Sequence, residues 1–208
     1  MDTRGCGVVV LAGGRGSRLG GVVKPGLAVG GRTMLSRVLD ATAGWSPRVV
    51  VGPDAVPLPE GVFRTVESPP GGGPVAGAAA GLSTLVEAAP EAGLVVLLAG
   101  DLPLLGADAV AALITAVRGT SDVDGACFVD PDGRRQLLCG VWRVAALAGS
   151  LAGIEADRGD VAGASMRALF AGLRVLEMSW DGAGAPPWFD CDTEEDLRRA
   201  ETWVSRES

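Results

Sequence analysis

The chain has 208 residues, which suffices for a substantial hydrophobic core, and we expect a single domain over residues 1–208. The formal net charge of −7 argues against a nucleic-acid-binding surface, and the apolar runs are too short for a transmembrane span or a signal peptide. The chain has no histidine, which excludes Ser-His-Asp catalysis, histidine-ligated zinc and imidazole general bases.

Strand-like and helical patterns alternate along the chain. Short apolar runs predict strands at residues 7–12, 48–52, 62–66, 94–101, 125–129, 136–143 and 174–178. The turn at 130–133 reads DPDG, so the two strands that flank it are predicted to form a hairpin. Apolar residues at helical spacing predict helices within residues 31–42, 73–89, 107–119, 161–172 and 193–204, with another beginning at Val144. Thr33 and Thr193 are predicted N-caps, and Pro74 a first-turn residue.

This alternation predicts an α/β fold, a Rossmann-like three-layer α/β/α sandwich around a mainly parallel sheet. In such folds, ligands bind beyond the carboxyl ends of the strands. We therefore expect the functional residues just after Ala12, Val66 and Ala99, and near Trp188. The glycine- and proline-containing stretch at 181–187 is expected to border the site.

The loop after the first strand combines glycines with positive charge. Residues 13–21 read GGRGSRLGG, and Lys24 follows them. Glycines allow a backbone to approach a ligand closely and to turn its amides toward it. Because Arg15, Arg18 and Lys24 add fixed positive charge, the loop suits a triphosphate. The alternative is a tight strand-to-helix turn with solvated arginines.

Two common nucleotide-binding motifs do not match this loop. The P-loop requires Ser or Thr after its lysine, but Pro25 follows Lys24. The GxGxxG fingerprint fails because Leu19 stands at its third glycine. Gly52 and Pro53 also follow the second strand, where an acidic residue is expected. A hydride-transfer enzyme is therefore disfavoured.

Asp101 is the strongest candidate for a metal ligand. It follows an apolar run that is predicted to be a central buried strand, so its carboxylate is aimed at the cleft. Mg²⁺ prefers carboxylate and phosphate oxygens and keeps some of its water. The alternative role, an N-cap, is disfavoured because the next helix is predicted to start at Ala107.

Four segments together resemble the MobA-like NTP transferases, the molybdenum cofactor guanylyltransferase family with its cytidylyltransferase and sugar-phosphate relatives. In chain order they read LAGGRGSRLGGVVK, ESPPGGGPVAGAAAGL, LLAGDLPLL and FDCDTEEDL. The resemblance spans residues 7–199, and the first segment combined with the third is its most specific part.

The resemblance implies a role for each matching position. Backbone groups of Leu11, Ala12 and Gly13 would contact the base, and Gly14, Arg15, Gly16, Ser17 and Arg18 would wrap the phosphates. Gly73, Pro74 and Gly77 would form a second wall. Arg15, Arg18, Lys24 and Asp101 would be catalytic, with Lys24 neutralising the phosphates and Asp101 holding Mg²⁺. An acceptor phosphate would attack the α-phosphorus of an NTP and release pyrophosphate.

Some positions depart from the family pattern. Val23 precedes the lysine, where an acidic residue is frequent, and Gly52 replaces a frequent Asn. Glu67 is followed by Ser68, where the guanylyltransferases often have Asp. We keep Gly52, Glu67 and Ser68 as expected nucleotide-binding residues, although these departures bear on the contacts to the base.

The segment Asp190-Cys191-Asp192-Thr193 leaves two interpretations open. It resembles the DxDT form of cytidylyltransferase relatives, and Asp192, or Asp190, would supply a second metal contact. Asp192 and Thr193 equally suit the start of a helix. The LAGG motif instead resembles purine users, since pyrimidine users typically have LAAG and a missing methyl group makes room for a larger base.

The acceptor side is less defined. Arg158 and Arg167 are candidates for an anionic acceptor, although a solvated helix face explains them equally. Trp142 and Trp188 are candidates for stacking on a flat pterin, with core packing as the alternative. The scattered Cys6, Cys127, Cys139 and Cys191 are typical of core residues in a reducing cytoplasm.

We therefore predict a cytoplasmic, Mg²⁺-dependent guanylyltransferase that transfers GMP from GTP to the phosphate of molybdopterin. Further partners would be a product-accepting molybdoenzyme or chaperone, with neither nucleic acid nor membrane involved. One alternative is cytidylyl transfer, or transfer to another phosphorylated acceptor. The other is a non-catalytic nucleotide-binding or regulatory domain, which Lys24 and Asp101 argue against and Val23 and Gly52 favour.

Overall fold

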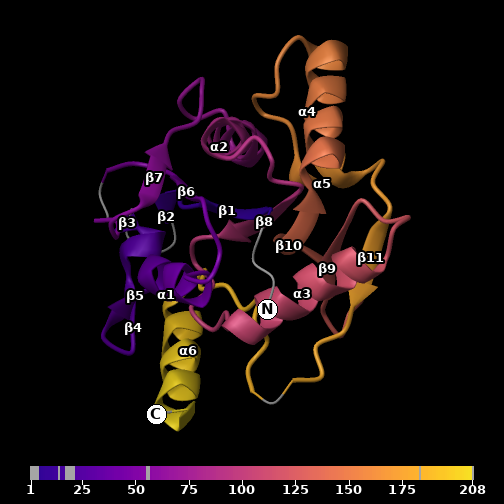
Figure 1. Ribbon diagram of the computed structural model, residues 1–208. Coiled ribbons are helices and arrows are strands. Elements are labelled where there is room, and N and C mark those ends of the chain that lie inside the picture. The colour runs from indigo at the N-terminus through magenta and orange to yellow at the C-terminus, as the bar shows by residue number, and fades with distance from the viewer. Residues whose placement is uncertain (1–4, 14, 17–21, 55–56, 183, 208) are drawn as a thin grey trace.

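A seven-stranded sheet forms the centre of the molecule (Figure 1). The computed structural model describes residues 5–13, 15–16, 22–54, 57–182 and 184–207. The strand order is β11 (Val175–Met178), β9 (Gly125–Val129), β10 (Arg135–Arg143), β8 (Leu94–Ala99), β1 (Cys6–Leu11), β6 (Arg48–Val51) and β7 (Val62–Thr65). Only β10 runs antiparallel to its neighbours among these strands, which confirms a mainly parallel sheet and the β9–β10 hairpin.

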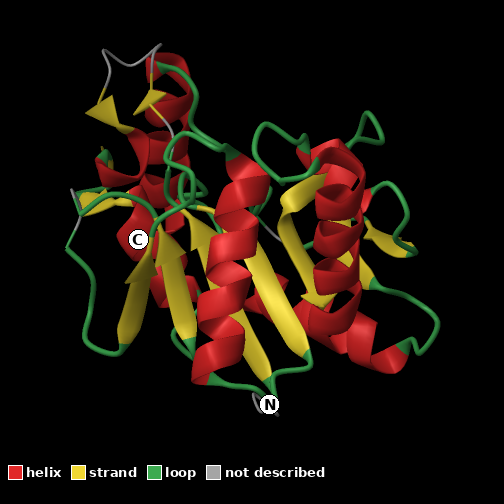
Figure 2. Cartoon of the chain, turned by 90° about the horizontal axis from the view of Figure 1, so that it is seen from above, coloured by secondary structure: helices red, strands yellow, loops and turns green. Residues whose placement is uncertain are grey.

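Helices cover both faces of the sheet, which confirms the three-layer prediction. One face is covered by α1 (Met34–Ala41) and α3 (Ala107–Gly119), and the other by α2 (Pro74–Ala88), α4 (Val144–Arg158) and α5 (Met166–Phe170). Figure 2 looks down on the second face, with its helices in front of the strands. Along β1, Val8 and Val10 pack toward the first layer and Val9 toward the second, as the two-residue period of a strand requires.

The C-terminal helix α6 (Glu194–Glu207) packs outside this sandwich, against the hairpin of β4 (Ala28–Val29) and β5 (Arg32–Thr33). The predicted N-cap is confirmed, because the Thr193 hydroxyl accepts from the Asp196 amide at 3.2 Å. The Asp196 carboxylate in turn accepts from the Thr193 amide at 2.9 Å. This reciprocal cap fixes the direction in which the chain enters α6.

The prediction of a helix over 161–172 is wrong in its extent, since α5 covers only Met166–Phe170. Gly163 has a φ of +67°, a left-handed conformation that a helix cannot contain. Ser165 caps the shorter helix by accepting from the Ala168 amide. Three further features have no counterpart in the sequence prediction: the hairpin of β2 (Arg15–Gly16) with β3 (Val22–Val23), the hairpin of β4 with β5, and the 3₁₀ helix η2 (Lys24–Gly26).

All four cysteines are buried and unpaired, as expected for core residues. Desolvation raises the pKa of Cys6 to about 12 and that of Cys127 to about 11, so both thiols stay protonated near neutral pH. Within the described ranges, no helix combines the length and the apolar character that crossing a bilayer requires.

The close packing of α2 on the sheet depends on Gly81. A Cβ atom there would lie 2.4 Å from Cγ1 of Val9 and 2.8 Å from Cγ2 of Val51. We expect Gly81→Ala to lower the free energy of unfolding by about 1–3 kcal/mol, because both valines are stiff and held in strands. The matched control is Gly149→Ala in α4. A Cβ atom added at Gly149 would have no contact within 4 Å outside its own helix backbone. This change should stabilise by about 0.5–1 kcal/mol. Equal urea midpoints for the two variants would contradict the packing argument.

Candidate active site

A large cavity opens where the central parallel strands end. Leu11 lies in register with Val51 on β6 and with Ala99 on β8, and all three residues line the cavity. Its volume is about 1060 Å³. The chain leaves β1 toward β6 and β7 and then returns to β8 on the other side of β1, so the cavity lies at the point where strand order reverses.

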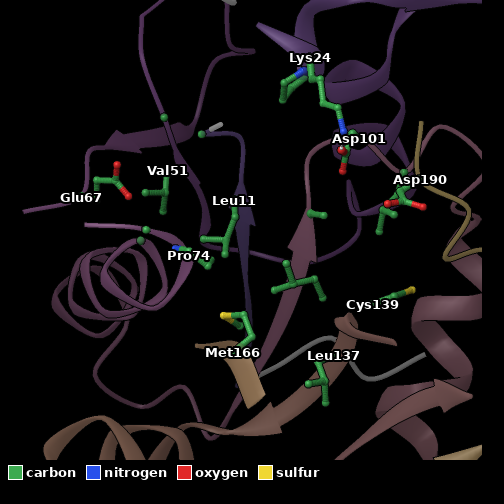
Figure 3. Close-up of a pocket in the computed structure, with 18 of the residues that line it drawn as sticks. Leu11, Lys24, Val51, Glu67, Pro74, Asp101, Leu137, Cys139, Met166 and Asp190 are labelled. Carbon is green, nitrogen blue, oxygen red and sulfur yellow. Dashed lines mark hydrogen bonds and ion pairs between the residues drawn. The ribbon is translucent and has the colours of Figure 1, made fainter. Parts of the chain in front are cut away.

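One end of the cavity is formed by the start of α2 and the ends of β1 and β6. A Cβ atom at Gly77 would lie 3.5 Å from Cδ2 of Leu11, 3.6 Å from Cγ1 of Val51 and 4.0 Å from Oε2 of Glu67. These side chains therefore surround a space that Gly77 leaves open. Oε1 of Glu67 accepts a hydrogen bond from the Gly71 amide at 2.9 Å, so its second oxygen remains available at the cavity (Figure 3).

Gly52 and Gly100 lack side chains, which allows them to pack closely against the backbone that leads out of β1. A Cβ atom at Gly52 would lie 2.9 Å from the carbonyl carbon of Ala12, and one at Gly100 would lie 3.2 Å from the Ala12 Cα atom. The Ala12 amide donates to the Val51 carbonyl at 2.8 Å, and the Gly100 amide donates to the Leu11 carbonyl at 2.9 Å. The Gly52 departure from the family pattern thus has a physical basis, since the neighbouring backbone occupies the space of a side chain.

At the other end, two carboxylates converge on one ammonium group. Nζ of Lys24 lies 3.3 Å from Oδ2 of Asp101 and also forms an ion pair with Asp192. Lys24 and Asp101 are labelled in Figure 3. The Lys24 and Asp101 side chains are 17% and 18% exposed, so solvent screens their attraction only in part. Burial alone would lower the pKa of Lys24, but its bonds to Asp192 and Asp101 raise the pKa above the ordinary lysine value. Lys24 therefore carries its charge throughout the physiological range.

Asp190 adds a third carboxylate to this end of the cavity. Desolvation, followed by the negative charges of Asp192 and Asp101, raises the pKa of Asp190 above the usual aspartate range. Across the described part of the chain, no three His, Cys, Asp or Glu side chains form a ready-made metal centre. The donors nevertheless fit Mg²⁺, which typically takes one or two carboxylates and completes its shell with phosphate and water. Asp101 and Asp192 already reach one common cation, the Lys24 ammonium.

The structure brings most of the predicted site residues together along the cavity. Those that line it are Leu11, Gly13, Lys24, Gly52, Glu67, Gly73, Pro74, Gly77 and Asp101. Ala12, Ser68 and Asp192 are not part of the lining, although Asp192 pairs with Lys24. Arg15 and Gly16 belong to β2. The Arg15 side chain and the residues Gly14, Ser17 and Arg18 lie outside what the structure describes.

Sequence reasoning missed the wall that β10 and α5 contribute. This wall consists of Gln136, Leu137, Leu138, Cys139 and Met166. The predicted hairpin located the strand, but a periodic apolar pattern does not show which part of a strand reaches a cavity. Two acceptor-side candidates, Arg158 and Arg167, do not line the cavity.

The two tryptophan candidates for stacking have different environments. Trp142 is fully buried and packs on Phe170 with ring centroids 4.1 Å apart, whereas Trp188 lines the cavity. The stretch 181–187 contributes no described residue to the lining, and the next residues along the chain that line the cavity are Trp188 and Asp190.

The sequence and the fold both match known nucleotidyltransferases. The family model for the MobA-like NTP transferase domain matches residues 8–175. A molybdenum cofactor guanylyltransferase from Rhizobium meliloti (strain 1021) is 32% identical over 205 residues, covering 94% of this chain and 90% of that protein. One from Bradyrhizobium sp. (strain ORS 278) is 29% identical, covering 96% and 93%.

Two solved structures share the fold at low sequence identity. Molybdopterin-guanine dinucleotide biosynthesis protein A from Archaeoglobus fulgidus has a TM-score of 0.72 at 20% identity, with 96% of this chain and 99% of that chain covered. A 4-diphosphocytidyl-2C-methyl-D-erythritol synthase from Anaerococcus prevotii has a TM-score of 0.70 at 15% identity, with 99% and 100% covered.

Proposed function

Because the chain belongs to the MobA-like NTP transferase family, we propose that it transfers GMP from GTP to the phosphate of molybdopterin. An acceptor phosphate oxygen would form a bond to the α-phosphorus while the bond from that phosphorus to the departing pyrophosphate breaks. The observation that carries this proposal is the convergence of Lys24, Asp101 and Asp192 at one end of a cavity whose other end has room for a base.

The chain would act mainly by positioning the phosphates and neutralising their charge. Transfer at a phosphate needs no covalent nucleophile, which suits a histidine-free protein. Lys24 would neutralise the triphosphate, together with Arg15 and Arg18 from the glycine-rich loop. Gly73 and Pro74, at the start of α2, would form the second wall of the nucleotide site at the end that has room for the base.

Asp101 and Asp192 would hold a divalent cation, which we propose to be Mg²⁺. When bound, Mg²⁺ would stabilise the negative charge that develops on the phosphate oxygens. For the two carboxylates to accept it, Lys24 has to release them, and the phosphates provide its new partner. Asp190, which lines the same end of the cavity, would be the alternative ligand.

We expect GTP to bind more tightly than CTP in the presence of Mg²⁺. Gly13 and Gly77 leave room for a purine, and the available oxygen of Glu67 would accept from the N–H groups of guanine. Glu67→Gln should weaken GTP binding about tenfold or more, since a hydrogen bond to a charged group contributes about 1.5–3 kcal/mol. Titration calorimetry with both nucleotides checks this. A CTP preference would move the assignment to cytidylyl transfer and give more weight to the Asp190–Thr193 segment.

Pyrophosphate release tests the function itself. The purified protein would be given molybdopterin and, in turn, each of the four NTPs with Mg²⁺. Pyrophosphate release with GTP but with no other NTP supports guanylyl transfer, and release with CTP supports the cytidylyltransferase alternative. Tight nucleotide binding without release, across phosphorylated acceptors, would indicate a regulatory nucleotide-binding domain.

We further propose that residues 1–208 act as one domain in the cytoplasm. Four unpaired, buried cysteines are consistent with a reducing compartment. A molybdoenzyme or its chaperone would receive the product.

A further inference from the structure

Part of the cavity lies beyond the residues that are proposed to bind the nucleotide. Its wall comprises Leu137, Leu138 and Cys139 of β10, Met166 of α5, and Trp188. The side chains that line this part are mostly apolar, with Gln136 and Asp190 as the polar ones. Among the described residues that line the cavity, Lys24 is the one cation, and it is paired with Asp101 and Asp192. This part therefore suits a flat, uncharged ring rather than a charged or sugar-like body.

Trp188 differs from the other tryptophans of the chain. Trp45 and Trp142 are buried in the core, and Trp203 packs on Phe189 in edge contact at 5.1 Å, outside the lining. Trp180 is also absent from the lining. Trp188 is only partly buried and lines the cavity, so it is the tryptophan placed to meet a ligand.

The Trp188 ring packs against the buried ring of Phe128. Its centroid lies 5.4 Å from that of Phe128, with 34° between the planes. Phe128 is fully buried and makes an edge contact with Trp180 at 5.5 Å. A ring held in this way loses little conformational entropy when a ligand stacks on it. This packing restricts the orientation of the Trp188 ring before a ligand binds.

Trp188 also lies on the segment that reaches the phosphate end of the cavity. It precedes Asp190 by two residues and Asp192, the partner of Lys24, by four. We propose that Trp188 is a specificity-determining residue for the acceptor and stacks on its flat pterin ring, with Leu137 and Met166 lining the same part of the cavity. This inference rests on the proposed function, because it takes the acceptor to be a phosphorylated pterin.

Direct binding of a pterin tests this without turnover. The probe is 6-hydroxymethylpterin, whose fluorescence is followed as protein is added. Trp188→Ala should weaken its binding roughly 5- to 150-fold, the range that stacking of a heterocycle on an aromatic side chain contributes. Trp188→Phe should retain most of the affinity, while Trp188→Leu, which is apolar but not planar, should lose it. The matched control is Trp203→Ala, which should bind the probe like the unchanged protein.

Steady-state kinetics supplies the second readout. In the pyrophosphate assay, Trp188→Ala should raise the KM for molybdopterin and leave the KM for GTP unchanged. Pterin binding that is equal in Trp188→Ala, Trp188→Leu and the unchanged protein would overturn the inference. Pterin binding that depends on Trp188, in a protein without guanylyl transfer, would support the ring site and refute the proposed function instead.

Discussion

We expect Asp101→Asn to fold normally and to lose turnover by about 100-fold or more, because the metal that Asp101 is proposed to hold would contribute several kcal/mol of transition-state stabilisation. Asp101 follows β8, whose residues Leu94 to Leu98 are buried by apolar packing on both faces, so the strand does not depend on the carboxylate. Asparagine preserves the size and one oxygen but removes the charge. Pyrophosphate release measures the rate, and the melting temperature reports the fold.

The matched control for this change is Asp108→Asn. Asp108 is an exposed acidic residue in the first turn of α3, only seven positions further along the chain. Its substitution should leave the rate near that of the unchanged protein.

Nucleotide binding by Asp101→Asn should also become less sensitive to Mg²⁺. Normal turnover would show that the metal is held elsewhere, with Asp190 and Asp192 next to be tested, and loss of folding would make Asp101 a structural residue.

The second large effect is expected for Lys24→Met, which should weaken GTP binding about tenfold or more. A hydrogen bond between charged groups contributes about 1.5–3 kcal/mol, and Lys24 is the only lysine in the chain. Methionine keeps the unbranched shape of the side chain and removes its charge. Titration calorimetry measures the change, and Lys24→Arg, which keeps the charge, is the control.

The same variant should bind a divalent cation more tightly than the unchanged protein when nucleotide is absent. Lys24 neutralises Asp101 and Asp192, and a cation held by these two carboxylates would have to displace it. In Lys24→Met that competition is gone. Mn²⁺ binding, followed by electron paramagnetic resonance, provides the measurement. Equal Mn²⁺ affinity in the two proteins would show that the ion pair does not occupy the metal position.

The sequence predicted the sheet, its helices and several caps because those features depend on local patterns. Apolar runs and helical spacing placed β1, β8 and α3, and hydroxyl groups at helix starts identified Thr33 and Thr193 as caps. The extent of α5 depended instead on the left-handed conformation of Gly163, which a glycine permits without requiring it.

The candidate site was predictable on its nucleotide side and less so on its acceptor side. Gly13, Glu67 and Asp101 follow strands, so the rule on carboxyl ends of strands located them. The wall from Leu137 and Met166 comes from an antiparallel strand and a short helix, to which that rule does not apply. The roles of Gly14, Ser17 and Arg18 remain predictions, since these residues lie outside the described ranges.

The packing of α6 has a consequence for how the protein is made. Lys24 and Asp192 are 168 positions apart, and the Thr193–Asp196 cap sets the segment that carries Asp192. Ribosomes extend a chain from its N-terminus at about 5–20 residues per second, so the glycine-rich loop emerges well before this carboxylate. During synthesis the sheet strands from β1 to β11 are complete while Lys24 still lacks Asp192. The ion pair, and with it the phosphate end of the cavity, can therefore form only after β11 has been synthesised.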